Sequence, residues 1–149
     1  MVNVILTFVW VSIAMIAHSF WEAYVEGTGG WAKNANGWRF RIADRIELTA
    51  YHFYLFVIEL PMLFLLPLAV YGWDLQVFGL LVSAFFFGTV LEDFFWFVVN
   101  PVFPFKDWNP RKVTWYPWLK IGKISIPWNY IIGLGIAVLS WYFIWKGAF

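Results

Sequence analysis

The sequence contains no cysteine and few charged side chains. Without cysteine, disulfides, thiolate metal sites and cysteine nucleophiles are excluded, and the redox compartment stays open. Charged residues make up 13% of the chain, whereas about 25% is usual in soluble domains. With only ten lysines and arginines, nucleic-acid binding is not expected. With 62% hydrophobic residues, this composition predicts a membrane protein.

Four hydrophobic segments are long enough to cross a bilayer, which takes about 20 apolar residues in a helix. They run approximately from Val2 to Val25, from Leu48 to Tyr71, from Val77 to Asn100 and from Pro127 to Trp145. The first segment is too long for a signal peptide and has no basic stretch before it. We therefore expect one all-α domain over residues 1–149, with four transmembrane helices in a bundle.

Basic residues are distributed unevenly between the two sides of these segments. Of the ten lysines and arginines, Lys146 alone lies outside the first and third connections. The others are Lys33, Arg39, Arg41, Arg45, Lys106, Arg111, Lys112, Lys120 and Lys123. Because cytoplasmic loops of membrane proteins carry an excess of basic residues, these two connections are predicted to be cytoplasmic and both termini to be outside.

The third connection is rich in proline, tryptophan and basic residues, which makes it too proline-rich for a helix and too aromatic for disorder. We expect it to lie folded at the membrane interface, next to anionic headgroups. The alternative is a lid over a polar site. Tryptophans at the segment ends predict aromatic belts at headgroup level. They include Trp73, Trp108, Trp115, Trp118, Trp128 and Trp145.

Ionisable residues lie within or beside the hydrophobic segments, where each costs about 2.5 to 3.5 kcal/mol and usually marks function. His18, Glu22 and Glu26 are four residues apart and share one face of the first helix, which the glycines of Gly27–Gly30 are expected to end. Glu26 and Glu47 lie near the interface and are expected to be solvated or paired with arginine. The candidate arginines are Arg39, Arg41 and Arg45.

The second and third segments add further ionisable groups. His52 and Glu59 are seven residues apart and are expected to share a helix face, while Glu92 and Asp93 lie at a similar depth in the third segment. Neighbouring residues on a helix point about 100° apart, so Glu92 and Asp93 face different partners. The sequence thus predicts one buried polar layer near the cytoplasmic side. Its candidate catalytic residues are His18, Glu22, His52, Glu59, Glu92 and Asp93.

Carboxyl and imidazole groups that are shielded from water can exchange a proton near neutral pH, so the layer predicts acid–base chemistry. The Glu-x-x-His spacing of di-metal helix bundles is absent. We expect no cofactor, with a single divalent metal ion as the alternative. Its candidate ligands are His18, His52, Glu22 and Glu92. In the fourth segment, which has no acidic, basic or histidine side chain before Lys146, Gly133 and Gly135 predict close helix packing.

Two resemblances follow from these stretches. The first is carried by VEGTGGWAKNANGWR and LEDFFWFVVNPVF, followed by WYPW and IPWNY. In these stretches the chain resembles an uncharacterised family of small four-helix prokaryotic membrane proteins. A fainter resemblance is to the EXPERA fold of the sterol isomerase type, carried by His18 with Glu22, Glu59 with Pro67, and Asp93. That resemblance implies a carboxyl group that moves a proton on a lipid double bond. The long tryptophan-rich connection has no counterpart in that fold.

Three functions stay open on the sequence alone. The leading one is a small membrane enzyme, of isomerase type, that acts on a lipid-soluble small molecule among membrane lipids. The second is a component of ion or proton transport, because buried acids and histidines also occur in transporters. The third is an accessory subunit of a larger complex. Homo-oligomers and partner subunits are compatible with all three.

Overall fold

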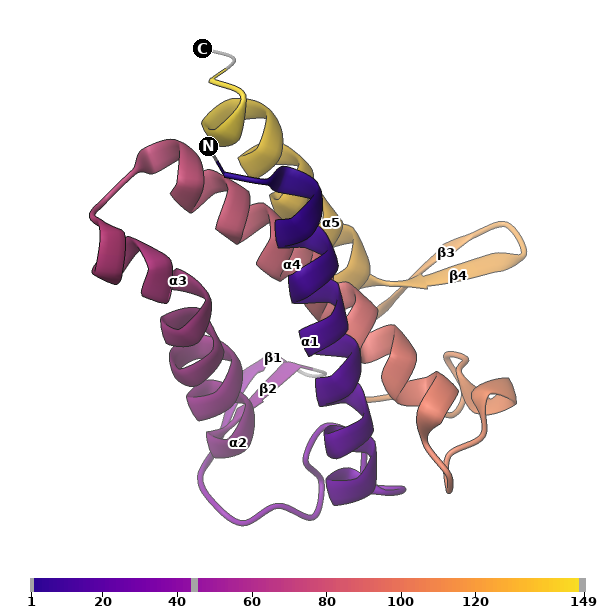
Figure 1. Ribbon diagram of the computed structural model, residues 1–149. Coiled ribbons are helices and arrows are strands. Elements are labelled where there is room, and N and C mark those ends of the chain that lie inside the picture. Colours follow the sequence, from indigo (N-terminus) through magenta and orange to yellow (C-terminus); the bar gives the residue numbers. More distant parts are fainter. Residues whose placement is uncertain (1, 44–45, 148–149) are drawn as a thin grey trace.

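The computed structural model describes residues 2–43 and 46–147, and it shows a mostly helical chain (Figure 1). Its helical elements are α1 (Val4–Glu26), α2 (Ala50–His52), the π-helix η1 (Phe53–Glu59), α3 (Leu60–Tyr71), α4 (Leu75–Val99), the 3-10 turn η2 (Phe105–Asp107), α5 (Trp128–Leu139) and the π-helix η3 (Ser140–Trp145). Because α2, η1 and α3 are continuous, as are α5 and η3, the described residues form four long helices. Their ends lie within two residues of the predicted ones.

Each of the four long helices is apolar and long enough to cross a membrane. Between 11% and 39% of the residues in their most hydrophobic stretches are buried inside the chain. Large apolar side chains such as Trp10, Met62 and Val138 point outward and are exposed. Most of the helical surface is therefore hydrophobic. Both chain ends lie at the same end of the helices (Figure 1).

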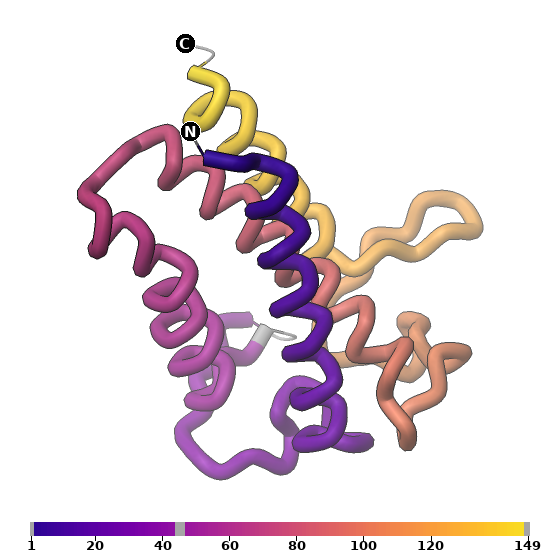
Figure 2. The backbone as a smooth tube through the Cα atoms, viewed as in Figure 1, coloured from indigo at the N-terminus to yellow at the C-terminus, as the bar shows by residue number. Residues whose placement is uncertain are grey.

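Helix α4 packs along α1 and along α5 with η3 (Figure 2). Glycines permit these close approaches, because a Cβ at Gly88 would lie 2.8 Å from Cγ of Met15. The packing role predicted for Gly133 is confirmed, since a Cβ there would lie 2.8 Å from Cγ2 of Val90. The same prediction for Gly135 is wrong, because that position faces open space.

Two buried serines connect α4 to the last helix. The Ser83 hydroxyl donates to the carbonyl of Ala137 at 2.8 Å, and the Ser140 hydroxyl donates to the carbonyl of Gly79 at 2.9 Å. Gly79 also marks a close approach, because a Cβ there would lie 2.5 Å from Cγ2 of Ile144. Side-chain hydrogen bonds and small residues thus join these two helices along their length.

Two antiparallel hairpins in the connections correct the all-α prediction. Strand β1 (Arg39–Ala43) pairs with β2 (Ile46–Thr49), and β3 (Trp118–Ile121) pairs with β4 (Ile124–Pro127). Gly122, with φ +59°, begins the two-residue turn between β3 and β4, a position where an L side chain would be strained. The prediction of four long helices is confirmed, and the two hairpins add short strands that the all-α prediction did not include.

An aromatic cluster covers the ends of α1 and α4 that lie away from the termini. Ala23, Trp96, Phe97, Val113 and Tyr116 are its buried residues. Phe103, Trp108, Trp115 and Trp118 pack against them. These last three tryptophans form a folded cap, hereafter the aromatic cap, and their predicted place in an aromatic belt stays a prediction. Trp73, by contrast, is exposed at the other end.

Candidate functional site

The site begins where α1 ends. As predicted, Gly27 ends this helix, with φ +58°, and its carbonyl accepts a hydrogen bond from Nδ2 of Asn100 at 2.8 Å. The following loop folds back, and Trp31 and Ala32 take positive φ angles of 64° and 49°. Such angles are uncommon for residues other than glycine and often occur at functional sites. The backbone N–H of Ala32 donates to the Glu26 carboxylate, so this loop covers Glu26.

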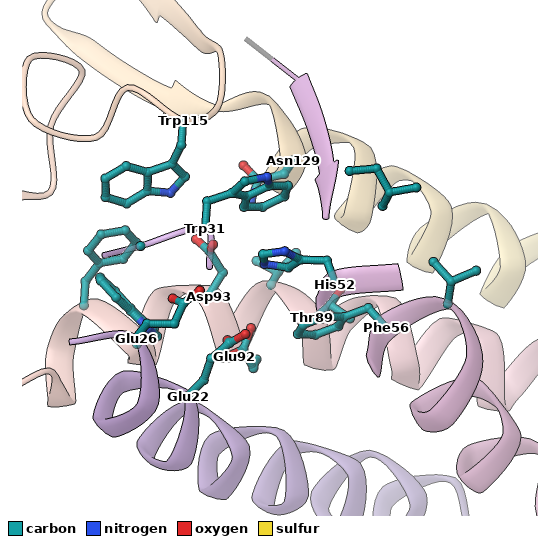
Figure 3. A pocket seen from close by; sticks show the side chains of 16 residues that line it. Glu22, Glu26, Trp31, His52, Phe56, Thr89, Glu92, Asp93, Trp115 and Asn129 are labelled. Carbon is teal, nitrogen blue, oxygen red and sulfur yellow. The ribbon is translucent and has the colours of Figure 1, made fainter. Parts of the chain in front are cut away.

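A pocket of about 280 Å³ lies among the ends of α1, α2, α4 and α5 (Figure 3). Its polar lining residues are Glu22, Glu26, His52, Thr89, Glu92, Asp93 and Asn129. Its aromatic lining residues are Trp31, Phe56, Trp96, Phe97 and Trp115. No lysine or arginine is found among the described residues that line it. Four carboxyl groups and an imidazole thus share one small space.

Four of the six predicted site residues line this pocket. They are Glu22, His52, Glu92 and Asp93. His18 lies outside the lining, with its ring against Trp21 and Phe56. Glu59 is exposed, although it was expected to share a face with His52. That expectation is wrong because the π-helix η1 separates the two residues, and its wider turns place the seventh residue on another face.

A second correction concerns Glu26, which was expected to be solvated or paired with arginine. It lines the pocket, and together with Glu22 and His52 it forms a group whose ligand atoms lie within 4.8 Å of one another. Two predicted metal ligands, Glu22 and His52, are thus in one cluster, with Glu26 in place of His18. The fourth candidate, Glu92, faces the Glu22 carboxyl (Figure 3).

Glu22 and Glu92 are the most deeply placed carboxyls of this group. They are 5% and 4% exposed, and Oε1 of each has no hydrogen-bond partner among the residues described. Buried polar atoms in native proteins are nearly always paired. Two unpaired carboxylate oxygens on adjacent side chains therefore call for a proton, a ligand or a metal ion between them.

The imidazole of His52 is held firmly. Its Nδ1 lies 2.7 Å from Oγ1 of Thr49, which also accepts a hydrogen bond from the His52 backbone N–H at 3.2 Å. Trp31 stacks on the ring at 4.2 Å and Phe56 at 6.0 Å between centroids. Trp31 is fixed in turn by its indole N–H, which donates to the carbonyl of Glu47 at 2.6 Å. With Nδ1 engaged by Thr49, Nε2 is the ring atom available for binding.

Asp93 has a different set of neighbours from Glu92, as the helix geometry predicted. Its carboxyl lies beside Tyr130 and Asn129 at the start of α5 and beside Tyr116 of the aromatic cap. Tyr116 also accepts a hydrogen bond from the indole of Trp108 at 3.3 Å. Burial, together with the nearby Asp93 carboxylate, raises the pKa of Tyr116 far above its ordinary value. Tyr116 therefore stays protonated as a donor next to Asp93.

No family model, curated protein or solved structure matches this chain. The two sequence resemblances stay predictions.

A second pocket, of about 320 Å³, adjoins the first and shares Gly30, Trp31 and Trp115 with it. Lys33, Arg39 and Lys112 are among its lining residues. Arg39 forms the predicted kind of ion pair with Glu47 at 2.8 Å. Arg45 lies outside the described residues. Two aromatic rings thus stand between an acidic pocket and a basic one.

Sequence reasoning missed several residues around the first pocket. Glu26 was placed at the interface because the return of the following loop was not foreseen. Asn129 and Tyr130 were passed over because they carry no charge, although they begin the fourth helix at the depth of the acidic layer. A count of all polar groups by depth, and not of ionisable ones alone, would have found both.

Proposed function

We propose that this chain is a small integral membrane enzyme that moves a proton on a lipid-soluble substrate. The observation that carries the proposal is the first pocket, which gathers four carboxyl groups and one imidazole with no lysine or arginine among its described lining residues. Groups of this kind, placed close together and shielded from water, are suited to general acid–base catalysis.

A bilayer is the environment that best suits the outer surface. Four apolar helices expose most of their large side chains, and water would be a costly medium for that surface. We infer that all four helices cross the membrane as one bundle. The basic connections then face the cytoplasm by the positive-inside rule, which puts both termini outside and the acidic pocket near the cytoplasmic surface.

The one-sided position of the pocket favours an enzyme over a transporter. Residues 4–17, 75–91 and 131–145 contain no aspartate, glutamate, histidine, lysine or arginine. A proton relay across the bilayer would need such groups, or water held by polar side chains, along the remaining depth. Glu59 is the one carboxyl further along a helix, and it is exposed and outside the pocket lining.

Within the pocket, Asp93 is the residue we assign to proton transfer. Its Oδ2 is buried and has no hydrogen-bond partner among the described residues, although Tyr116 and Tyr130 lie beside the carboxyl. These two tyrosines act as positioning residues, because they are buried and do not line the pocket themselves. Thr89 and Asn129 are the neutral polar groups placed to orient a substrate.

The second pocket supplies a reason for the substrate class. A molecule that spans both pockets would place an anionic group near Lys33 and Lys112 and an apolar, reacting part between Trp31 and Trp115. We infer an amphiphilic lipid with an anionic headgroup. Basic side chains at the cytoplasmic surface of a membrane commonly attract such headgroups.

The test uses deuterium as a tracer, because an enzyme that moves protons incorporates solvent hydrogen into its product. Detergent-purified protein is incubated in D₂O buffer with a total membrane lipid extract, which is then analysed by mass spectrometry. A lipid that gains deuterium with the wild type, with Glu59→Gln and not with Asp93→Asn supports the proposal. No deuterated lipid, or full incorporation by Asp93→Asn, contradicts it.

A further inference from the structure

We propose that the first pocket binds one divalent transition-metal ion through Glu22, Glu26 and His52. The ion would share this pocket with Asp93, but its binding needs no lipid substrate and is measured separately from proton transfer. Glu22 and Glu26 lie on successive turns of α1 and on one face, while His52 comes from the start of the second long helix (Figure 3). The ligand set therefore joins two helices that are distant in the sequence.

The distances fit one ion. The three ligand atoms lie within 4.8 Å of one another. Around a zinc ion, bonds of about 2.0 to 2.2 Å to nitrogen and oxygen place ligand atoms about 3 to 4 Å apart. A small rotation of the glutamate side chains is enough to close the triangle, and these side chains have several rotatable bonds.

A second observation, the lack of hydrogen-bond partners for buried carboxyl oxygens, also points to a ligand at this position. Oε1 of Glu22 and Oε1 of Glu92 are buried and have no hydrogen-bond partner among the described residues. The two carboxyls face each other beside His52 (Figure 3). An ion at the cluster would give Glu22 a partner and place a positive charge next to Glu92.

Charge balance favours a cation as well. The ion pair between Arg39 and Glu47 is the one salt bridge found in the described part of the chain, and it lies outside the first pocket's lining. The carboxylates of Glu22, Glu26 and Glu92 thus have no basic side chain among the described lining residues to offset them. A dication would neutralise two of these groups in their ionised form, whereas without an ion they must hold protons, since burying unpaired charges is strongly unfavourable.

His52 is prepared as a ligand in the way usual for metal sites. Metal-binding histidines commonly donate their second ring N–H to an oxygen, which fixes the ring and its tautomer. Here Thr49 Oγ1 lies 2.7 Å from Nδ1 and leaves Nε2 for the ion. Stacking by Trp31 holds the ring plane. One imidazole with two carboxylates suits zinc, manganese or iron better than magnesium or calcium, which prefer oxygen ligands throughout.

The experiment measures metal content directly and needs no substrate. The full chain is purified in detergent, stripped with a chelator, loaded with Zn²⁺ and analysed by mass spectrometry, and its affinity is measured by competition with a chromogenic chelator. We expect one zinc ion per wild-type chain. Loss of a group that hydrogen-bonds to a metal ligand already weakens metal binding by about 10- to 100-fold. Loss of a ligand itself should cost more, so we expect Glu22→Gln, Glu26→Gln and His52→Ala each to weaken zinc binding by more than about 100-fold.

His18→Ala is the matched control, because His18 lies on the same helix and outside the pocket lining. It should keep wild-type zinc content. The glutamine variants keep the side-chain size, and gel filtration confirms that each variant is folded. A wild type that holds no more zinc than Glu22→Gln, or a folded His52→Ala with wild-type affinity, overturns the site.

This outcome is separable from that of the proposed function. Asp93→Asn should lose deuterium transfer and keep its zinc. If zinc binds as expected and no lipid gains deuterium, the metal site stands and the proton-transfer proposal falls. If deuterium is incorporated and no zinc binds, the reverse holds.

Discussion

Replacement of Thr49 by valine tests how the structure prepares His52. Thr49 is 3% exposed, and its hydroxyl serves both Nδ1 and the backbone N–H of His52, the latter as the N-cap of α2. Valine keeps the branched shape and removes only the hydroxyl. Loss of a threonine N-cap typically costs about 1 kcal/mol in the free energy of unfolding. Loss of the partner to a ligating histidine should also weaken zinc binding by about 10- to 100-fold.

Thr49→Ser is the matched control, because it keeps the hydroxyl and removes a buried methyl group. Removing that methyl costs about 0.8 kcal/mol, so the two variants should be similarly destabilised for different reasons. Zinc affinity then separates them, since the valine variant alone loses the contact to Nδ1. Unfolding in mixed micelles gives the stability, and chelator competition gives the affinity. Equal zinc affinities for the two variants would refute the role assigned to this hydroxyl.

Three further predictions concern packing and topology. Gly79→Ala should lower the free energy of unfolding in mixed micelles by about 1 to 3 kcal/mol, because the added methyl group overpacks the helix contact. Gly135→Ala should not lower it, because Gly135 faces open space. Equal stabilities of the two variants would contradict this packing. Ser83→Ala should cost about 0.6 kcal/mol in the same assay, and no measurable loss would mean that its buried hydrogen bond is not stabilising. Single cysteines in place of Lys33 and Lys146 should react with an impermeant maleimide from opposite sides of the membrane, and labelling from one side would refute the topology.

The helices and the depth of the acidic layer could be predicted from the sequence. Hydrophobic length alone located all four helices, because a span needs about 20 apolar residues. The rise of about 1.5 Å per residue was enough to bring Glu22 and Glu92 to the same level from different helices. Their facing carboxyls confirm that part of the reasoning.

The rest depended on features that helical periodicity does not contain. The π-helix η1 broke the spacing that paired His52 with Glu59, and nothing in FYLFVIE distinguishes it from an α-helix. The loop after α1 folds back at Trp31 and covers Glu26, which the helical pattern could not indicate. One missed feature was predictable, because LKIGKISI alternates around Gly122 in the way typical of a hairpin.

The π-helix η1 also has a consequence for the evolution of this chain. A π-helix holds more residues per turn than an α-helix, so deletion of a single residue between Phe53 and Glu59 would let regular α-helical geometry return. Six α-helical residues turn the chain about as far as seven π-helical ones, so everything before the deletion would keep nearly the same rotation relative to α3. His52 would then stay at the pocket, and the hydrophobic helix would stay long enough for the membrane. A related chain that is one residue shorter in this segment should therefore keep both the architecture and the imidazole in its site.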